Sequence, residues 1–564
     1  MQSVVRVLFL PLIGLLAAQP VRAQSALPLQ HAPRPTTSAI TAADLMTRLY
    51  IYADDSMMGR EAGTAGNVRG TNYIAAELRR MGLQPAGDSG TYFQTIPLKT
   101  RSFDTTSTFT VAGAPLALFT DYLPLTRQPS STASVPIVFG GMMGDSAHQL
   151  SAEQAAGKLV VLTTPGFNSL RALRRAPTVA GAWGVALIGL DSMPPQFMGF
   201  LRRPQMFLDD NPPGPSQPPI FLVTQAAAAK MFTTRLDSLT PGSAGASAAV
   251  DVRYDVTAIA DPARNVVAIV PGSDPRLKGE FVAIGAHNDH IGLARPVDHD
   301  SIRIWNHVVR PEGADDGGKQ ATPAQQASVD SLLAAYRATH PGSTRVDSIS
   351  NGADDDGSGT VSALEVAERL VSMPRKPKRS ILFVWHTGEE KGLLGSRFFT
   401  DHPTVSRDSI VAQLNMDMVG RGDAIDETGR TKDGIAIRGT PTYLQLVGSR
   451  RLSTELGNLI ETVNTQGHHG LTLDYAIDAD GHPSNIYCRS DHYSYARYGI
   501  PITFFTTGLH SDYHQVTDEP EYIDYDHMAR VANFVADIAL HVADLDHRVV
   551  VDHPKPDPAA PCRQ

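Results

Sequence analysis

Residues able to bind metal ions recur along the chain at places where short apolar segments end. They lie in five segments of distinct character: GAHNDH, GADDDGSG, WHTGEEKGLLGS, LNMDMVG and SDYHQVTDEP. Together they could hold two divalent cations and leave one carboxylate free as a base, which is what peptide-bond hydrolysis by a pair of metals requires. The set therefore predicts zinc-dependent hydrolysis. The candidates are His287, Asp289, Asp355, Glu389, Glu390, Asp417 and His514.

The first segment contains a His-x-Asp unit at the expected end of a strand. Side chains at i and i+2 of a strand point the same way, so Asp289 could hold one ring N–H of His287 while the other nitrogen binds zinc. His290 lies beyond the expected strand end, and we choose His287 as the ligand. A polar surface turn is the alternative interpretation.

Three consecutive acids, 354–356, precede Gly-Ser-Gly and an apolar helical pattern. The amides at a helix N-terminus favour anions, and a carboxylate bridging two cations suits this position. We choose the central acid, Asp355, as the bridge and expect its neighbours to support the turn; a solvated acidic loop is the alternative. A similar sequence at 313–318 is rejected because no strand precedes it.

Two adjacent acids, Glu389 and Glu390, follow the apolar run SILFVWH. After a buried strand, one could bind metal while the other acts as a general base, typically worth about 10²–10⁴-fold in rate. Asp417 ends another apolar run and could instead be a turn or capping residue. His514 lies in a loop, where a structural or exposed histidine is the alternative, so its assignment depends on the others.

The elements that must position these residues are expected from Asn265 onward. NVVAIV and EFVAIGA are expected as a pair of strands, with SILFVWH, VAQLNM and PITFFTT as further strands. Helical patterns lie at 361–371, 441–459 and 527–545. This alternation predicts an α/β fold with a mixed, mainly parallel sheet flanked by helices on both faces. Because the candidates follow apolar runs, they should share the rim at the carboxyl ends of the strands.

The remaining organisation follows from changes in composition. Helices are expected at 42–53 and 67–81, and short β-rich runs with one helix at 224–236 form an insert. A polar stretch, 295–350, with a helix at 323–339, has the length of a functional lid or surface excursion. The predicted divisions are a signal peptide 1–23, a linker 24–41, an N-terminal part of the catalytic domain 42–129, the insert 130–252, the catalytic domain 253–545 and a tail 546–564.

The composition and the first residues of the chain limit the possible locations and partners of the protein. The formal net charge of −9, with no basic stripe, argues against a nucleic-acid partner. Arg6 precedes an apolar run too short to span a bilayer, and small residues near Ala23 suit cleavage, which predicts a secreted or periplasmic protein without stable membrane insertion. An exported location permits a disulfide between Cys488 and Cys562; two separate thiols are equally compatible with the sequence.

With these residues in view, the chain resembles the co-catalytic di-zinc aminopeptidases of metallopeptidase family 28. The resemblance covers 265–545 and the lead-in SMMGREAGTAGNVRGTNYIAAELRRMGLQP, and the ligand motifs occur in the family's order. The β-rich insert, with GKLVVLTTPG and AGAWGVALIGL, looks like a protease-associated domain. The fold that the resemblance implies is that of the zinc exopeptidases.

The resemblance also implies roles for individual residues. One zinc would lie on His287 and Asp417 and the other on Glu390 and His514, with Asp355 bridging the two. Glu389 would be the general base, and the peptide bond after Asp355 is often cis in this family. Tyr487, three residues before Ser-Asp-His, occupies a position that resembles the family's transition-state tyrosine.

The expected activity is that of an exported aminopeptidase that removes the N-terminal residue of peptide substrates. The alternative is a glutamate-carboxypeptidase-type enzyme or another amide hydrolase on the same scaffold. A free Arg489 or Arg497, able to clamp a C-terminal carboxylate, would favour that alternative. Glutaminyl cyclisation and a catalytically inactive binding protein are disfavoured because the sequence retains the full ligand set and the base.

Overall fold

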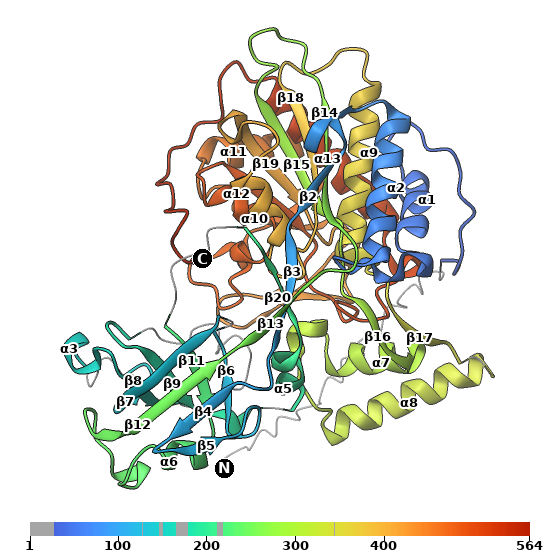
Figure 1. Cartoon of the computed structure of the whole chain (residues 1–564). Helices are drawn as coiled ribbons and strands as arrows, with labels where there is room; N and C mark the ends of the chain where they lie inside the picture. Colours follow the sequence, from blue (N-terminus) through green and yellow to red (C-terminus); the bar gives the residue numbers. More distant parts are fainter. Residues whose placement is uncertain are drawn as a thin grey trace, which may run out of the picture.

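Two β-sheet regions dominate the molecule, which is described from a computed structural model (Figure 1). The structure describes residues 27–126, 128–145, 150–164, 179–193, 195–210, 218–342 and 344–564. The predicted signal peptide, 1–23, lies outside these residues.

A nine-stranded sheet forms the core of the larger region. Its strands are β1 (Gln84–Pro85), β2 (Phe93–Ile96), β14 (Ala263–Val270), β15 (Phe281–His287), β18 (Ser380–His386), β19 (Ile410–Met416), β22 (Tyr443–Val447), β23 (Thr472–Asp474) and β24 (Ile502–Thr506). The order is β1-β14-β18-β15-β19-β24-β22-β23, with β2 beside β14. The central strands β18, β15, β19 and β24 are parallel, whereas β14 and β22 run antiparallel to them. The predicted mixed, mainly parallel sheet is confirmed.

Helices cover both faces of this sheet, as predicted (Figure 1). Alternate residues of each buried strand face opposite ways, so Val266 packs in one apolar cluster and Val267 in the other. The helices of the first cluster are α1 (Ala42–Tyr52), α2 (Ala65–Met81), α9 (Gly359–Ser372), α11 (Thr454–Gln466) and α13 (Tyr525–Ala543). Those of the second are α10 (Leu394–Asp401) and α12 (His492–Ala496).

The second region is β-rich and contains none of the candidate metal ligands. An eight-stranded sheet has the order β5-β4-β12-β7-β8-β9-β11-β6, and β3, β10 and β13 form a three-stranded sheet beside it. We predict limits of 130 and 252 for this insert; strands β4 to β6 lie before residue 130 and pair within the same sheet. The strands are β3 (Leu98–Phe103), β4 (Thr108–Val111), β5 (Ala114–Leu116), β6 (Tyr122–Pro124), β7 (Ser130–Met142), β8 (Leu159–Thr163), β9 (Gly184–Ile188), β10 (Gln205–Leu208), β11 (Ile220–Val223), β12 (Ala244–Val252) and β13 (Tyr254–Ala258).

The polar stretch at 295–350 leaves and rejoins the main region through a two-stranded stem. Strands β16 (Gly292–Asp298) and β17 (Val346–Ser350) pair antiparallel, with Gly292 opposite Ser350. Two helices, α7 (His299–Val309) and α8 (Pro323–Thr339), pack against each other at the end of this stem. The predicted helix at 323–339 is confirmed.

Three expectations about local structure are wrong. The segment expected as a helix over 441–459 contains strand β22, and helix α11 starts only at Thr454. All five residues of the strand, YLQLV, are buried, which suits a strand between two others. The strands β14 and β15 do not pair, because β18 lies between them. The helix expected over 224–236 is limited to α6 (Gln225–Ala229).

Two further features bear on the sequence analysis. Cys488 and Cys562 are joined by a disulfide that fastens the C-terminal segment beside the sheet. Among the described residues, no helix is both long and apolar enough to cross a bilayer.

A buried arginine fastens the N-terminal helices to α9. Arg48 on α1 is 1% exposed and forms an ion pair with Glu77 on α2 at 2.6 Å. It also contacts Glu365 and Glu368, both on α9. Arg80 contacts Glu368 as well, at 3.1 Å, but its side chain is 45% exposed. Burial should therefore make Arg48 the stronger contributor to stability.

We predict that Arg48→Met lowers the free energy of unfolding by about 3–5 kcal/mol, because it leaves buried carboxylates without their counter-ion. The matched change Arg80→Met should lower it by less than about 1 kcal/mol, because water already screens that pair. Urea denaturation measured on both variants checks this difference. Equal losses would contradict the dominant role of Arg48.

Candidate metal centre

Four parallel strands bring the candidate residues to one rim of the sheet. His287 is the last residue of β15, and Asp417 directly follows β19. The pair Glu389 and Glu390 comes three residues after β18 ends, and His514 lies in the loop after β24. Because these strands run parallel, their carboxyl ends meet at the same edge. The expectation of a shared rim is confirmed.

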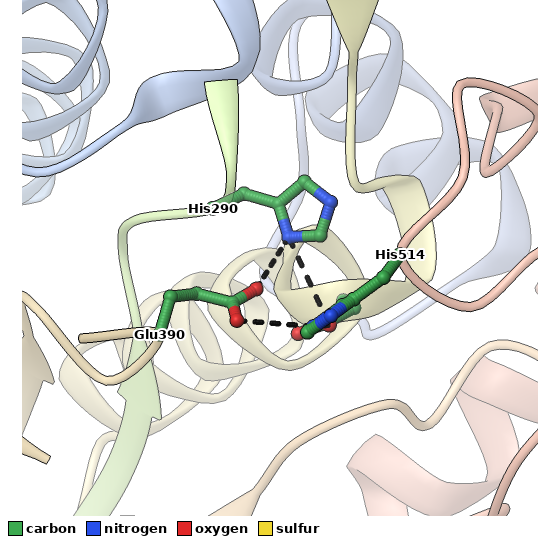
Figure 2. A group of neighbouring side chains, drawn as sticks. His290, Glu390 and His514 are labelled. Atoms are coloured by element: carbon green, nitrogen blue, oxygen red, sulfur yellow. Dashed lines mark hydrogen bonds and ion pairs between the residues drawn. The ribbon is translucent and has the colours of Figure 1, made fainter. Parts of the chain in front are cut away.

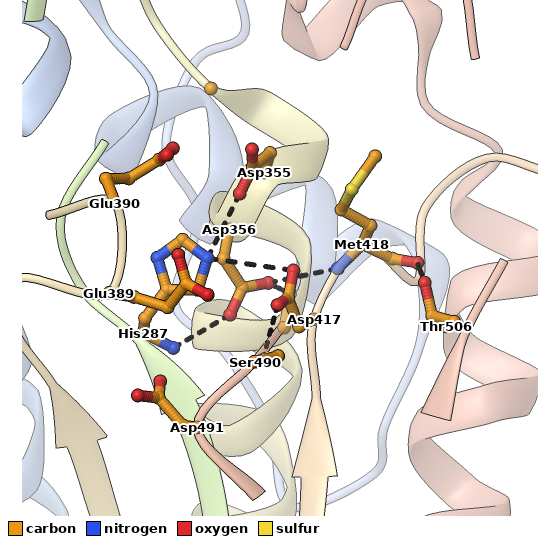
Figure 3. A network of polar contacts seen from close by, with 12 residues as sticks. His287, Asp355, Asp356, Glu389, Glu390, Asp417, Met418, Ser490, Asp491 and Thr506 are labelled. Atoms are coloured by element: carbon orange, nitrogen blue, oxygen red, sulfur yellow. Dashed lines mark hydrogen bonds and ion pairs between the residues drawn. The ribbon is translucent and has the colours of Figure 1, made fainter. Parts of the chain in front are cut away.

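Asp355 lies between two histidines that come from different segments of the chain, and Figure 3 shows it beside the first of them, His287. Its Oδ1 is 3.0 Å from Nε2 of His287, and its Oδ2 is 2.9 Å from Nε2 of His514. The two carboxylate oxygens thus face two separate groups of potential ligands. This is the geometry that a bridging carboxylate requires.

Two groups of side chains share Asp355. Within each group, the potential ligand atoms all lie within 4.8 Å of one another. Imidazole nitrogen and carboxylate oxygen are both donors that zinc accepts, and each group offers at least three. The donor set therefore fits two zinc ions that share Asp355. The first group is His287, Asp355 and Asp417; the second is His290, Asp355, Glu390 and His514.

His290, which the sequence analysis set aside because it lies beyond the strand end, is a member of the second group (Figure 2). Its Nδ1 lies 2.8 Å from Oε1 of Glu390, while Nε2 of His514 lies 3.0 Å from Oε2 of the same carboxylate. The loop after β15 turns back because the backbone N–H of His290 donates to the carbonyl of Arg60. A second histidine three residues after His287 was the signal available in the sequence.

The expected support of His287 by the Asp289 carboxylate is wrong in detail. Nδ1 of His287 lies 3.0 Å from the backbone carbonyl of Asp289, whereas Oδ1 of that residue is 3.9 Å away. The carboxylate instead accepts a hydrogen bond from the backbone N–H of Glu389 at 3.1 Å. Burial raises the pKa of Asp289 to about 7. Asp289 therefore orients His287 through its backbone carbonyl and the loop that carries Glu389 through its carboxylate.

The two acids that flank Asp355 in the sequence accept hydrogen bonds from backbone N–H groups and so support the turn, as expected. Asp356 accepts hydrogen bonds from the backbone N–H groups of His287 and Gly359, both at 2.9 Å. Asp354 accepts one from Gly420 at 2.7 Å. The peptide bond between Asp355 and Asp356 is cis, as the family resemblance implied. These contacts join the start of α9 to the ends of β15 and β19.

Asp417 is oriented by a short chain of polar side chains. The hydroxyl of Ser490 donates to Oδ2 of Asp417 at 2.7 Å and accepts from the side-chain amide of Asn415 at 3.1 Å. All three residues are buried. The other carboxylate oxygen, Oδ1, faces Nε2 of His287 at 3.6 Å.

The environment separates the pKa values of the two adjacent glutamates. Burial raises the pKa of the Glu389 carboxyl well above its usual range; Asp417 and Glu390 raise it further, and His287 opposes them. Burial also acts to raise the pKa of Glu390, but His514 and His290 lower it to about 2. Divergent pKa values in neighbouring acids mark different chemical roles. The surroundings thus favour the anionic form of Glu390 and the protonated form of Glu389.

An open cavity lies over this group of residues. Asp355, Glu389, Asp417 and His514 line its polar end. Apolar side chains line another part of the wall: Met418, Ile477, Ile486, Phe504 and Leu509.

Tyr487 does not line this cavity. It is 7% exposed, belongs to the apolar cluster of the second sheet face, and lies against the Arg451 guanidinium. The role in transition-state binding expected from its place in the sequence therefore has no support in its position. Tyr513, next to His514, does line the cavity, and burial raises the pKa of its hydroxyl.

The two arginines that line the cavity are both held by carboxylates. Arg489 makes two contacts with Asp315, at 2.7 and 3.0 Å, and Arg430 contacts Glu312 at 2.7 Å. Both acids come from the insertion at 295–350. Arg497, the other arginine considered in the sequence analysis, pairs with Asp401. Neither Arg489 nor Arg497 is free to clamp a substrate carboxylate.

Comparison with known proteins agrees with this geometry. The family model described as Peptidase family M28 matches residues 326–539, which include Asp355, Glu390, Asp417 and His514. The chain is 29% identical over 200 residues to leucine aminopeptidase 1 of Aspergillus oryzae, covering 34% of this chain and 47% of that protein. For leucine aminopeptidase 1 of Ajellomyces capsulatus the identity is 30% over 205 residues, covering 35% and 48%. The chain spans about half the length of these relatives.

Solved structures with a similar chain course are more distant. An aminopeptidase from Aneurinibacillus is 16% identical, with a TM-score of 0.47 and coverage of 91% of this chain and 97% of that one. A zinc aminopeptidase from Bacillus subtilis is 17% identical, with a TM-score of 0.43 and coverage of 90% and 96%. The match to peptidase family M28 thus covers residues 326–539, the part of the chain that holds four of the candidate metal ligands.

Proposed function

We propose that the protein is an exported two-zinc aminopeptidase. The observation that carries this proposal is the position of Asp355, whose two oxygens lie 3.0 and 2.9 Å from Nε2 of His287 and of His514. In this assignment one zinc binds His287 and Asp417 and the other binds Glu390 and His514. Zinc held there would polarise the substrate carbonyl as a Lewis acid and would lower the pKa of a bound water.

Glu389 carries the proton transfer in this proposal. It lines the cavity beside Asp355 and Asp417. Its N–H is fixed by Asp289, so the loop that carries it is held in place. The carboxylate accepts a proton from the attacking water and returns it to the departing amine. Such a group typically contributes about 10²–10⁴-fold to the rate.

The lining of the cavity offers no free cation to a C-terminal carboxylate among the residues that the structure describes. Asp355 and Asp417 are ligands of the proposed zinc ions, so the metals neutralise their charge, and the lining arginines, Arg430 and Arg489, are paired with acids of the insertion. An aminopeptidase is therefore favoured over the carboxypeptidase alternative, and peptides are the proposed substrates.

The apolar wall of the cavity suits an aliphatic or aromatic first residue. Met418, Ile486 and Phe504 supply part of this wall. The names of the two leucine aminopeptidases agree with such a preference. An exported location is supported by the N-terminal sequence and by the disulfide between Cys488 and Cys562, since disulfides persist in oxidising compartments.

The proposed activity is tested with aminoacyl anilides. We predict that the leucine anilide is hydrolysed and that its N-acetylated form is not, because acetylation removes the positive charge and occupies the space beside the carboxylates. A chelator should abolish hydrolysis, and added zinc should restore it. Efficient hydrolysis of N-acetylated peptides from their C-terminal end would favour the carboxypeptidase alternative.

The two glutamates give a matched pair of variants. We predict that Glu389→Gln retains both catalytic metals but loses about 10²–10⁴-fold in kcat with little change in KM, because the amide cannot accept the proton. Glu390→Gln should weaken the metal on the His514 side, because a neutral amide is a poor replacement for a carboxylate. Metal analysis and steady-state kinetics on both variants check this. The reverse pattern would exchange the two roles.

The substrate preference is tested at the apolar wall. We predict that Ile486→Glu lowers kcat/KM for the leucine anilide by about 10-fold or more, because a hydrophobic pocket discriminates by about 1–3 kcal/mol for a single mismatch. The lysine anilide should gain relative to leucine because the new carboxylate attracts its side chain. Ile486→Val is the control and should keep the order of the two substrates. An unchanged ratio in the glutamate variant would place the first residue elsewhere.

A further inference from the structure

A third group of metal-binding side chains lies outside the centre described above. His299 at the start of α7, Asp347 on β17 and Glu519 in the segment after His514 place one ligand atom each within 4.8 Å of one another. They come from three separate segments of the chain. Two belong to the insertion that spans 295–350, and the third belongs to the loop that follows β24.

The histidine of this group is arranged as a metal ligand would be. Its side chain is fully buried, and its Nδ1 lies 3.3 Å from Oδ1 of Asp300. Its Nε2 is buried and has no hydrogen-bond partner among the residues that the structure describes. A carboxylate on one ring nitrogen fixes the tautomer that leaves the lone pair on the other, which is the usual support of a metal-bound histidine. His299 therefore has one nitrogen available for a cation.

The charge around the group also calls for a cation. Arg345 contacts Glu521 and lies 3.2 Å from Glu519 and 3.9 Å from Asp347. The carboxylates of Asp347, Glu519 and Glu521 share one guanidinium, so the group carries an excess of negative charge that a cation would offset. Glu519 is 4% exposed, so water contributes little to this balance.

We propose that His299, Asp347 and Glu519 form a third divalent-cation site. The combination of one imidazole and two carboxylates suits zinc or a similar transition metal, whereas calcium takes oxygen ligands alone. A cation here would bind the base of the insertion to the segment 512–521. The site lies apart from the predicted catalytic ligands and serves a structural purpose.

This site is linked to the bridging aspartate through the backbone. Asn351 donates from its side-chain amide to Glu519 at 3.1 Å. The neighbouring Asp518 accepts hydrogen bonds from the backbone N–H groups of Asp354 and Asp355, at 2.9 and 3.0 Å. A cation bound to Glu519 would therefore hold in place the segment whose Asp518 accepts the hydrogen bond from the backbone N–H of Asp355.

The test is a metal analysis of the full chain, purified and dialysed against metal-free buffer after loading with zinc. The wild-type protein should retain about three zinc ions, and His299→Gln should retain about two. His340→Gln, which removes an exposed histidine at the C-terminal cap of α8 in the same insertion, should not change the wild-type value. Asp347→Asn is a second variant at the half-buried edge of the group, for use if the histidine variant does not fold.

Crystals of the wild-type protein provide a readout that needs no variant. Anomalous diffraction at the zinc absorption edge should show a peak between His299, Asp347 and Glu519, separate from the peaks at Asp355. A catalytic centre with its peaks and no peak at His299 would overturn this proposal and leave the proposed function intact. A peak at His299 with none at Asp355 would do the opposite.

Discussion

Burying many carboxylates at one rim of a sheet is the constraint on which the structure depends. Asp289, Asp355, Asp356, Glu390 and Asp417 lie together with almost no access to water, and each anion there costs several kcal/mol unless it is compensated. Backbone N–H groups supply part of the compensation: they bind the outer acids of the 354–356 triplet and leave the central one free. Histidines supply a second part, and the donor set has the number and type of atoms for metal ions to supply the remainder.

The same constraint explains why the supporting residues are as specific as the ligands. Asp289 and Asp356 take up orphan backbone donors at the points where β15 and β18 end, and Ser490 fills one side of Asp417. Each of these hydrogen bonds restricts the movement of a buried carboxylate toward solvent. The result is a set of ligand atoms positioned by hydrogen bonds to rigid elements, which is what pre-organisation of a metal centre requires.

Much of this centre could be predicted from the sequence, because a run of apolar residues followed by a polar one identifies the end of a buried strand. This reasoning places His287, Asp417 and the Glu389 pair at the same rim without any knowledge of pairing order. It fails where contacts between residues far apart in the sequence determine the position of a side chain. His290 is brought back to Glu390 by the carbonyl of Arg60, more than two hundred residues earlier in the chain, and no local pattern shows that contact. The side chain of Tyr487 points into an apolar cluster, which its spacing from Ser-Asp-His does not determine. The segment of β22 has a helical pattern in the sequence, but its burial between two neighbouring strands outweighs that local preference.

The stem of the 295–350 insertion has a consequence for how this protein could diversify. Gly292 and Ser350 lie opposite each other, so the whole insertion enters and leaves the main region at a single point. Its acids nevertheless reach the cavity wall, where Glu312 and Asp315 hold Arg430 and Arg489 in place. Substitutions in the insertion could thus remove one partner from each of two positive charges at the cavity without altering a residue of the nine-stranded sheet. The acids that hold these arginines and the ligands of the predicted metal centre lie in separate stretches of the chain, so the charge at the cavity can change while the ligand set is preserved.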